Sequence, residues 1–191
     1  MPRTRALPPT SVYQVLVTLQ HIEPAVWRRL VLPSNLRLGK LHRVLQCVFD
    51  WENYHLHQFV VGDTFYGVPD PEWGDELPMI DERTVPLSRV HKNVGDTIVY
   101  ADDFGDSWRH EVLLEAILPV HADRTYPLCV AGVRARPPDD VGGAGGYVHF
   151  LAAIGDPAHA EHDALLTWAG SVFDPEGCDV NMINRQLRRV R

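Results

Sequence analysis

Hydrophobic and polar residues alternate in the first part of the chain and recur at helical spacing later. Alternation over residues 13–19 and again over 26–32 predicts two strands, and the turn at Glu23-Pro24 predicts that they pair as a hairpin. From Leu38 to Phe49 the hydrophobic residues fall three or four positions apart, which predicts a helix that ends near Trp51.

Further strands and helices are expected along the rest of the chain. Residues 56–61, 98–101 and 108–117 have strand patterns, and a turn-rich stretch at 62–86 follows the first of these. After a connection rich in proline and glycine, helices are predicted at 147–154, from the Asp156-Pro157 cap to about residue 168, and after a cap at Asp179.

This order of elements predicts an α+β fold. The sheet should be mainly antiparallel, with one covering helix after the first hairpin and a helical section at the C-terminal end. The opening β-β-α-β order is compatible with a β-grasp-like core. A chain of 191 residues fits one domain, expected at 11–191 behind a flexible leader at 1–10.

The net charge and the cysteines indicate which classes of function and which compartment suit this protein. The net charge of -7 argues against a mainly electrostatic nucleic-acid binder, although arginines gather near the C-terminus, where they suit a helix end. No apolar run approaches the roughly 20 residues of a membrane helix. Three widely separated cysteines without a C-x-x-C pair indicate a reducing compartment, so a soluble, cytoplasmic protein is expected. The partner class stays open: an unknown ligand or a protein.

The densest group of reactive residues lies at 100–110. Gly105 and its neighbours predict a tight turn, after which Trp108 and His110 share one face of a strand. His110 could act as an acid/base or a metal ligand oriented by an aspartate, with Asp103 as the remaining candidate partner. The alternative is a core histidine beside aspartates that cap a turn.

Two other segments carry candidate binding residues. In the first, Arg134 could bind a carboxylate or phosphate, or could pair with Asp139 and Asp140 in a rigid crossover. In the second, Trp27 precedes Arg28, which falls on the hydrophobic face of its strand. An internal arginine requires an anion close by.

The histidines give no complete metal-ligand pattern. His55 and His57 alternate along one strand, and His159 and His162 lie one helical turn apart, but each pair supplies only two ligands. The H-E-x-x-H and G-x-S-x-G patterns are absent. No metal site is therefore predicted, and no cofactor is identified.

Several segments in order resemble the plasmid pRiA4b ORF-3-like family over about residues 12–188. They are Ile22–Arg29, Leu41–Gln46, Trp51, His55-Leu56, Tyr100, Asp103–His110, Tyr126–Cys129, Arg134–Gly143, Gly146-Tyr147, Phe150-Leu151, Asp156-Pro157, Glu161-His162 and Phe173–Glu176. The chain has Arg136 where the family pattern usually has a cysteine, so it cannot form any thiol or metal pair that depends on that cysteine. The resemblance implies a mostly uncharacterised family that occurs on chromosomes and mobile elements and sometimes carries a resolvase-like label. This sequence shows no serine-recombinase pattern.

Three functional hypotheses follow. The favoured one is a binding or accessory module, with an aromatic-polar cleft formed by the 102–110 hairpin, Trp27 with Arg28, and the Pro137-Pro138 turn. The second is a hydrolase-type enzyme that uses His110 and an aspartate, with or without a divalent metal. The third, nucleic-acid processing linked to mobile elements, rests on the family label alone.

Overall fold

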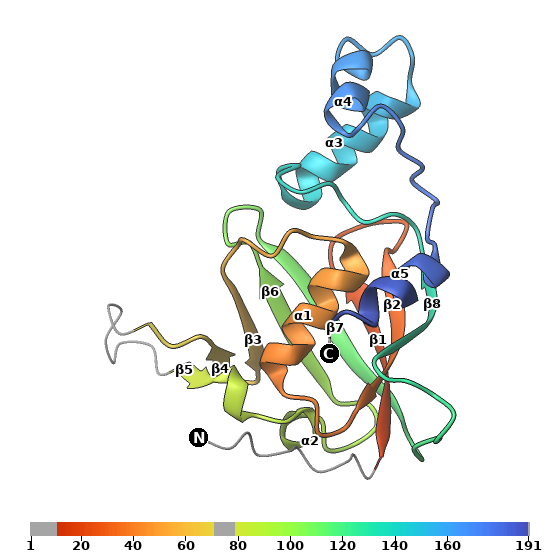
Figure 1. The fold of residues 1–191 in the computed structure, drawn as a ribbon. Coiled ribbons are helices and arrows are strands. Elements are labelled where there is room, and N and C mark those ends of the chain that lie inside the picture. Colours follow the sequence, from red (N-terminus) through yellow and green to blue (C-terminus); the bar gives the residue numbers. More distant parts are fainter. Residues whose placement is uncertain (1–10, 71–78, 191) are drawn as a thin grey trace.

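The computed structural model describes residues 11–70 and 79–190, and its centre is one twisted sheet (Figure 1). Eight strands of the described residues follow the order β5-β4-β3-β6-β7-β1-β2-β8. All neighbours run antiparallel except β4 and β5, which are parallel. The strands are β1 (Val12–Leu19), β2 (Trp27–Pro33), β3 (His57–Val61), β4 (Thr64–Gly67), β5 (Met79–Asp81), β6 (Thr97–Asp102), β7 (Trp108–Leu118) and β8 (Leu128–Val133).

The first hairpin consists of the two predicted strands. In it, β1 pairs antiparallel with β2, so that Val17 lies opposite Arg28. Every second residue of the alternating stretch in β1 is buried, as a strand with one face against the core requires: Tyr13, Val15, Val17 and Leu19. The β-grasp expectation holds only for the order of the first four elements, because the strand beside β1, β7, runs antiparallel to it.

Helices cover one face of the sheet. The helix α1 (Leu38–Phe49) buries its hydrophobic stripe there, as predicted. The C-terminal α5 (Val180–Leu187) lies beside α1 and β8, and the Asp179 side chain caps it by accepting a hydrogen bond from the Met182 backbone N–H. Two short helical turns, η2 (Glu82–Thr84) and α2 (Leu87–Val90), close the end of the layer.

The opposite face of the sheet is polar at its centre. There Arg29 of β2 makes two hydrogen bonds to Glu115 of β7, at 2.7 and 2.8 Å, and Gln14 of β1 donates to the same carboxylate. These pairs hold three neighbouring strands together across the sheet. The arrangement is therefore α+β, with a hydrophobic core between the sheet and the helices.

Two helices form a lobe that stands away from the sheet (Figure 1). They are α3 (Gly143–Gly155) and α4 (His162–Trp168), which contact each other. The chain enters the lobe through residues 134–142 and leaves it through 169–179. Both connections pass the same end of the sheet, where the candidate site lies.

The remaining sequence predictions differ from the structure mainly in short elements. β8 lies in a stretch expected to be irregular, and β4 and β5 lie in the stretch expected to be turns. The helix predicted from Asp156 begins only at His162; Asp156 instead accepts the Ala158 backbone N–H in a turn. The expected leader at 1–10 lies outside the described residues, as does part of the 62–86 stretch. In the described part of the chain, no helix combines the length and apolar character needed to cross a membrane.

Candidate functional site

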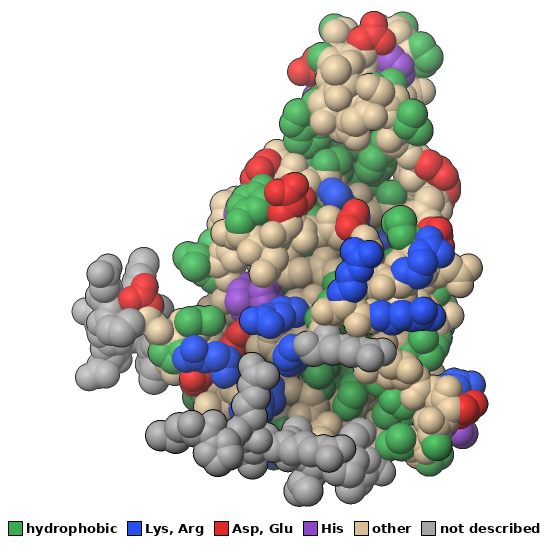
Figure 2. All heavy atoms as spheres, in the orientation of Figure 1, with side chains coloured by type: hydrophobic (Ala, Val, Ile, Leu, Met, Phe, Trp, Pro, Cys, Tyr) green, Lys and Arg blue, Asp and Glu red, His purple; other side chains and the backbone are tan. Residues whose placement is uncertain are grey.

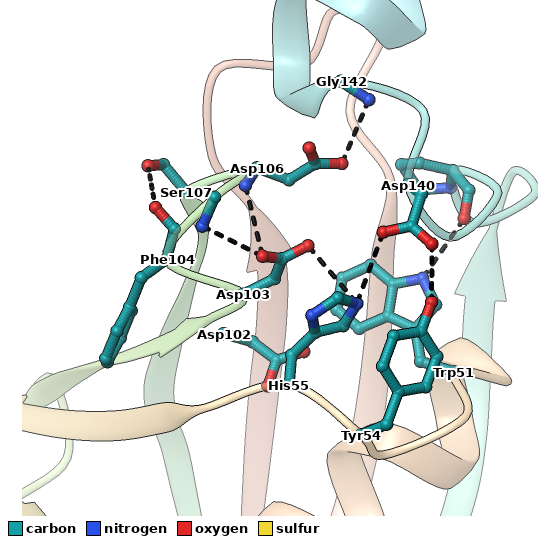
Figure 3. A network of polar contacts seen from close by, with 12 residues as sticks. Trp51, Tyr54, His55, Asp102, Asp103, Phe104, Asp106, Ser107, Asp140 and Gly142 are labelled. Atoms are coloured by element: carbon teal, nitrogen blue, oxygen red, sulfur yellow. Dashed lines mark hydrogen bonds and ion pairs between the residues drawn. The ribbon is translucent and has the colours of Figure 1, made fainter.

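A network of polar side chains forms where the β6–β7 hairpin meets the segment that leads into the helical lobe (Figure 3). Asp106 of the hairpin accepts a hydrogen bond from the Gly142 backbone N–H at 3.0 Å, which joins the two segments. Asp103 accepts the backbone N–H groups of Gly105 and Asp106 through its Oδ1 atom. The hairpin turn is thus fixed by a carboxylate that still has its second oxygen available.

His55 lies between two carboxylates in this network (Figure 3). Its Nε2 atom is 3.5 Å from Asp103 Oδ2 and 3.6 Å from Asp140 Oδ1. The backbone N–H of Asp103 donates to the Leu56 carbonyl, and this bond brings the segment before β3 against the hairpin. His55 Nε2 is buried and makes no hydrogen bond with any described residue. A polar atom in this situation is expected to have a partner.

Asp140 also uses only one of its oxygens. The Tyr54 hydroxyl donates to Asp140 Oδ2 at 2.7 Å, while Oδ1 faces His55. Both Asp103 and Asp140 have left-handed backbones, with φ of 52° and 56°. Aspartate tolerates this conformation better than most residues, yet it is uncommon away from turns and functional sites. Two segments that are distant in the sequence therefore each adopt the left-handed conformation at the residue that lies beside His55.

The Tyr54–Asp140 bond has a measurable consequence. Because the phenol donates to a carboxylate, the hydrogen bond to Asp140 raises the pKa of Tyr54 to about 12. We expect Asp140→Asn to return this pKa toward 10, since the amide carries no charge. Ultraviolet absorbance titration of tyrosine would measure it, with Asp139→Asn as a comparison that should lower the pKa of Tyr54 less, because the Asp139 charge contributes less to this pKa than Asp140 does. An unchanged tyrosine titration in Asp140→Asn would contradict the pairing.

The predicted pairing of His110 with an aspartate is not formed. His110 is fully buried, and its ring packs against the rings of Phe49, Trp51 and Tyr100. Burial lowers its pKa to about 3, with a smaller opposing contribution from the Tyr100 backbone. Asp103 faces His55 instead. Strand alternation placed His110 on the same face as Trp108, and that face of β7 packs against the core.

A second polar cluster lies nearby inside the protein. The rings of His42 and His57 are stacked with centroids 3.5 Å apart, and His57 Nε2 is 3.0 Å from the buried Glu82 carboxylate. Asp102 accepts hydrogen bonds from Gln46 and Tyr100, and the Tyr100 hydroxyl also lies 2.8 Å from His42 Nδ1. These polar groups satisfy one another. The cluster therefore connects α1 to β6 without requiring a ligand.

The other predicted binding residues occupy separate places. Arg28 is buried under α1, whereas Trp27 lies on the opposite face of the sheet beneath the Arg29 guanidinium. Arg134 pairs with Glu176 at 2.8 Å and not with Asp139 or Asp140. Two other predicted residues, Trp108 and Asp139, lie near the site without joining its network. Trp108 packs against Trp51, whose Nε1 donates a hydrogen bond to the Pro137 carbonyl before the Asp139-Asp140 loop. Asp139 is half-buried in that loop.

Sequence reasoning thus named two of the three residues that the structure brings together here, Asp103 and Asp140, and did not place His55 with them. It grouped His55 with His57 by strand alternation, but the strand begins only at His57. No local spacing connects His55 with residues 48 and 85 positions further along the chain. The family resemblance, which included His55-Leu56 together with both aspartate segments, was the signal that could have joined them.

Comparison with known proteins shows which family the chain belongs to. The sequence pattern of the plasmid pRiA4b ORF-3-like proteins matches residues 11–182. The chain belongs to this family. It is 39% identical over 178 residues to "Uncharacterized protein y4hQ" of Sinorhizobium fredii (strain NBRC 101917 / NGR234), which covers 93% of this chain and 91% of that protein.

A crystal structure of a similar protein has the same fold. "Protein of Unknown Function MM3350 from Methanosarcina mazei Go1" superimposes with a TM-score of 0.82 at 35% identity, over 90% of this chain and 96% of that one. The family match includes every residue of the network around His55. Neither relative's name states a ligand or an activity, so the function must be inferred from the site.

Proposed function

We propose that this protein is a binding module whose ligand is a divalent transition-metal ion, held by His55 Nε2, Asp103 Oδ2 and Asp140 Oδ1. One observation carries the proposal: a buried imidazole nitrogen without a hydrogen bond lies between two carboxylate oxygens, at 3.5 and 3.6 Å. Ligand atoms from the three residues all lie within 4.8 Å of one another.

The spacing of these atoms suits a small ion. Zinc binds histidine nitrogen and carboxylate oxygen at about 2.0–2.2 Å. At that distance, the separations of 3.5 and 3.6 Å between His55 Nε2 and the two carboxylate oxygens correspond to nitrogen–metal–oxygen angles of about 115°. Such angles are close to tetrahedral. A mixed nitrogen and oxygen donor set favours Zn²⁺ or Mn²⁺ over Mg²⁺ and Ca²⁺, which prefer oxygen alone.

The surrounding hydrogen bonds also suit a metal site. Each carboxylate uses one oxygen for a hydrogen bond, from Tyr54 or from the hairpin backbone, and directs the other toward His55. Partners of this kind orient the ligands of known metal centres. The Asp140 side chain is 65% exposed, so the ion would retain open positions for water or for a donor atom of a further ligand.

Two other groups of histidine and carboxylate residues have weaker claims. The cluster of His42, His57 and Asp102 is satisfied by its own hydrogen bonds. In the helical lobe His149 hydrogen-bonds Glu161 at 2.8 Å on an exposed surface, beside His159. Only the site at His55 combines three ligand atoms with a buried nitrogen that no described residue satisfies.

The proposal predicts stoichiometric binding of Zn²⁺ or Mn²⁺. Calorimetric titration of metal-free protein should give one site, and His55→Ala should weaken it by about 100-fold or more because a ligand is lost. Tyr54→Phe should weaken it by about 10-fold, since it removes only a supporting hydrogen bond. Acidification should also weaken binding, because the ligands of a metal ion must be deprotonated to bind it.

The matched control is His121→Ala, which removes an exposed histidine on a loop outside the network. It should leave the affinity unchanged. If the metal-free protein binds neither ion at one equivalent, or if His55→Ala and His121→Ala bind equally well, the proposal is wrong. Circular dichroism of each variant would show that the fold is retained.

A further inference from the structure

A buried arginine with no carboxylate partner among the described residues lies beside a hollow on the other side of the 134–142 segment. Arg28 is 3% exposed, and its guanidinium donates to three backbone carbonyls: Nε to Val48, and Nη1 to Trp27 and Val133. Its carbon Cζ lies 5.3 Å from the centre of the Phe49 ring. These contacts satisfy three N–H donors, but the acceptors are neutral carbonyls and do not balance the positive charge of the guanidinium.

The remaining nitrogen of Arg28 is free among the described residues. Nη2 has no hydrogen-bond partner there, and it is not among the fully enclosed atoms that lack one. Arg28 lines a hollow of about 240 Å³ between the end of α1, residues 135–138, residues 169–179 and α5. Burial lowers the pKa of Arg28, as expected for a cation without a carboxylate beside it. Two donors of a buried cation therefore face an open space.

The charges around the hollow determine which anion fits. Arg136 lies 3.9 Å from Asp50, and Asp179 lies 3.8 Å from Arg185 while also capping α5. These acids already have cationic neighbours, which leaves the charge of Arg28 uncompensated. An anion with one negative charge would balance the charge of Arg28, whereas a doubly charged phosphate would also be repelled by Asp50 and Asp179. Lysine and arginine side chains gather over α1 and α5 on this face of the molecule (Figure 2).

The rest of the lining is largely apolar. Phe173, Met182 and Ile183 line the hollow, together with Val48 and Ala135. This hollow is smaller than the pockets of about 300–1,000 Å³ that hold drug-sized ligands, so it suits a small molecule. We propose that this hollow binds a small aliphatic monocarboxylate, with its carboxylate on Arg28 Nη2 and its hydrocarbon part against Phe173 and Met182.

Cys178 offers a direct test because it lines the same hollow. A side chain at Gly132 would come within 2.8 Å of both Arg28 Cδ and Cys178 Sγ, so the two groups lie against the same glycine. Iodoacetate carries a carboxylate, whereas iodoacetamide is neutral and of similar size. We expect the ratio of their alkylation rates at Cys178 to be about tenfold higher in the folded protein than in urea, since a charged pocket concentrates its counter-ion. Mass spectrometry of the Cys178 peptide would give both rates.

Competition and substitution complete the experiment. Butyrate should protect Cys178 from alkylation, and inorganic phosphate should protect less well. Arg28→Met should abolish the preference for iodoacetate, whereas Arg29→Met, on the opposite face, should retain it. Should Arg28→Met fail to fold, the rate ratio and butyrate protection in the unchanged protein still decide. Equal ratios in folded and denatured protein would overturn the anion site, and protection by phosphate but not by butyrate would overturn the monocarboxylate assignment.

Discussion

Gly146→Ala is expected to destabilise the protein by about 3 kcal/mol, the scale of a severe steric overlap in a packed region. A Cβ atom built on Gly146 would lie in forbidden overlap with the backbone carbonyl oxygen of Val141, which belongs to the connection into the helical lobe. Neither group is the flexible end of a side chain, so helix α3 or the connection must move. Because Val141 follows Asp140 directly, the same movement should weaken metal binding at His55.

Gly145→Ala is the matched control. Apart from its chain neighbours and the backbone of its own helix, no atom of the described residues lies within 4 Å of the position that its Cβ would occupy, and the residue is already helical. Alanine there should leave stability unchanged or raise it by up to about 1 kcal/mol, because alanine favours the helix more than glycine does. Urea unfolding of both variants tests the contrast. Equal stabilities for the two would show that α3 does not need the close approach at Gly146.

The second large effect is a loss of stability in mild acid. Burial lowers the pKa of His110 to about 3 and is the main cause that lowers the pKa of His42 to about 4. In the unfolded chain both histidines titrate near 6.5, so below that pH the unfolded state binds more protons than the folded state. Stability therefore falls as pH falls from about 6.5 toward the folded pKa values. Well below pH 6.5 each histidine contributes about 1.4 kcal/mol per pH unit. Because only half of the unfolded histidines are protonated at pH 6.5 itself, the two together contribute roughly 3 kcal/mol between pH 6.5 and pH 5.

Denaturant unfolding at a series of pH values would measure this slope. His110→Phe keeps an aromatic ring among Phe49, Trp51 and Tyr100 and should remove about half of the acid sensitivity. His121→Ala, at an exposed position, should leave the slope as it is. Burial raises the pKa of Asp102, so proton uptake by this carboxylate in the folded state opposes part of the loss. A wild-type stability that is flat between pH 6.5 and pH 5 would contradict the neutral, buried state of His110.

The elements that sequence predicted well are those whose pattern is complete within the element. The alternation of β1 and β2 and the helical stripe of α1 each record burial against the same core, so periodicity was enough. The Asp179 cap at the start of α5 is equally local. In contrast, β8 contains Gly132 next to an irregular connection, and its pairing with β2 shifts register at Arg29-Leu30, which removes the regular alternation.

The candidate site was harder to predict because its geometry depends on distant segments. Asp103 and Asp140 were identified as polar residues in turns, and the structure brings both to His55. Strand alternation also placed Arg28 and His110 correctly on the inner face. It could not show that their neighbours would be backbone carbonyls and aromatic rings instead of carboxylates. Those neighbours are set by packing between elements, which a single sequence does not specify.

The strand order has a consequence for how the chain folds during synthesis. The β1–β2 hairpin joins residues that are neighbours in sequence, but its other partner, β7, ends at Leu118, which pairs with Val12. Roughly a hundred residues must therefore leave the ribosome before the centre of the sheet can close, and pairing over such separations is intrinsically slow. Until then β1 has an unpaired edge of alternating hydrophobic residues, which could pair with another nascent chain. The region most exposed to misassembly is thus the centre of the finished sheet rather than its edges.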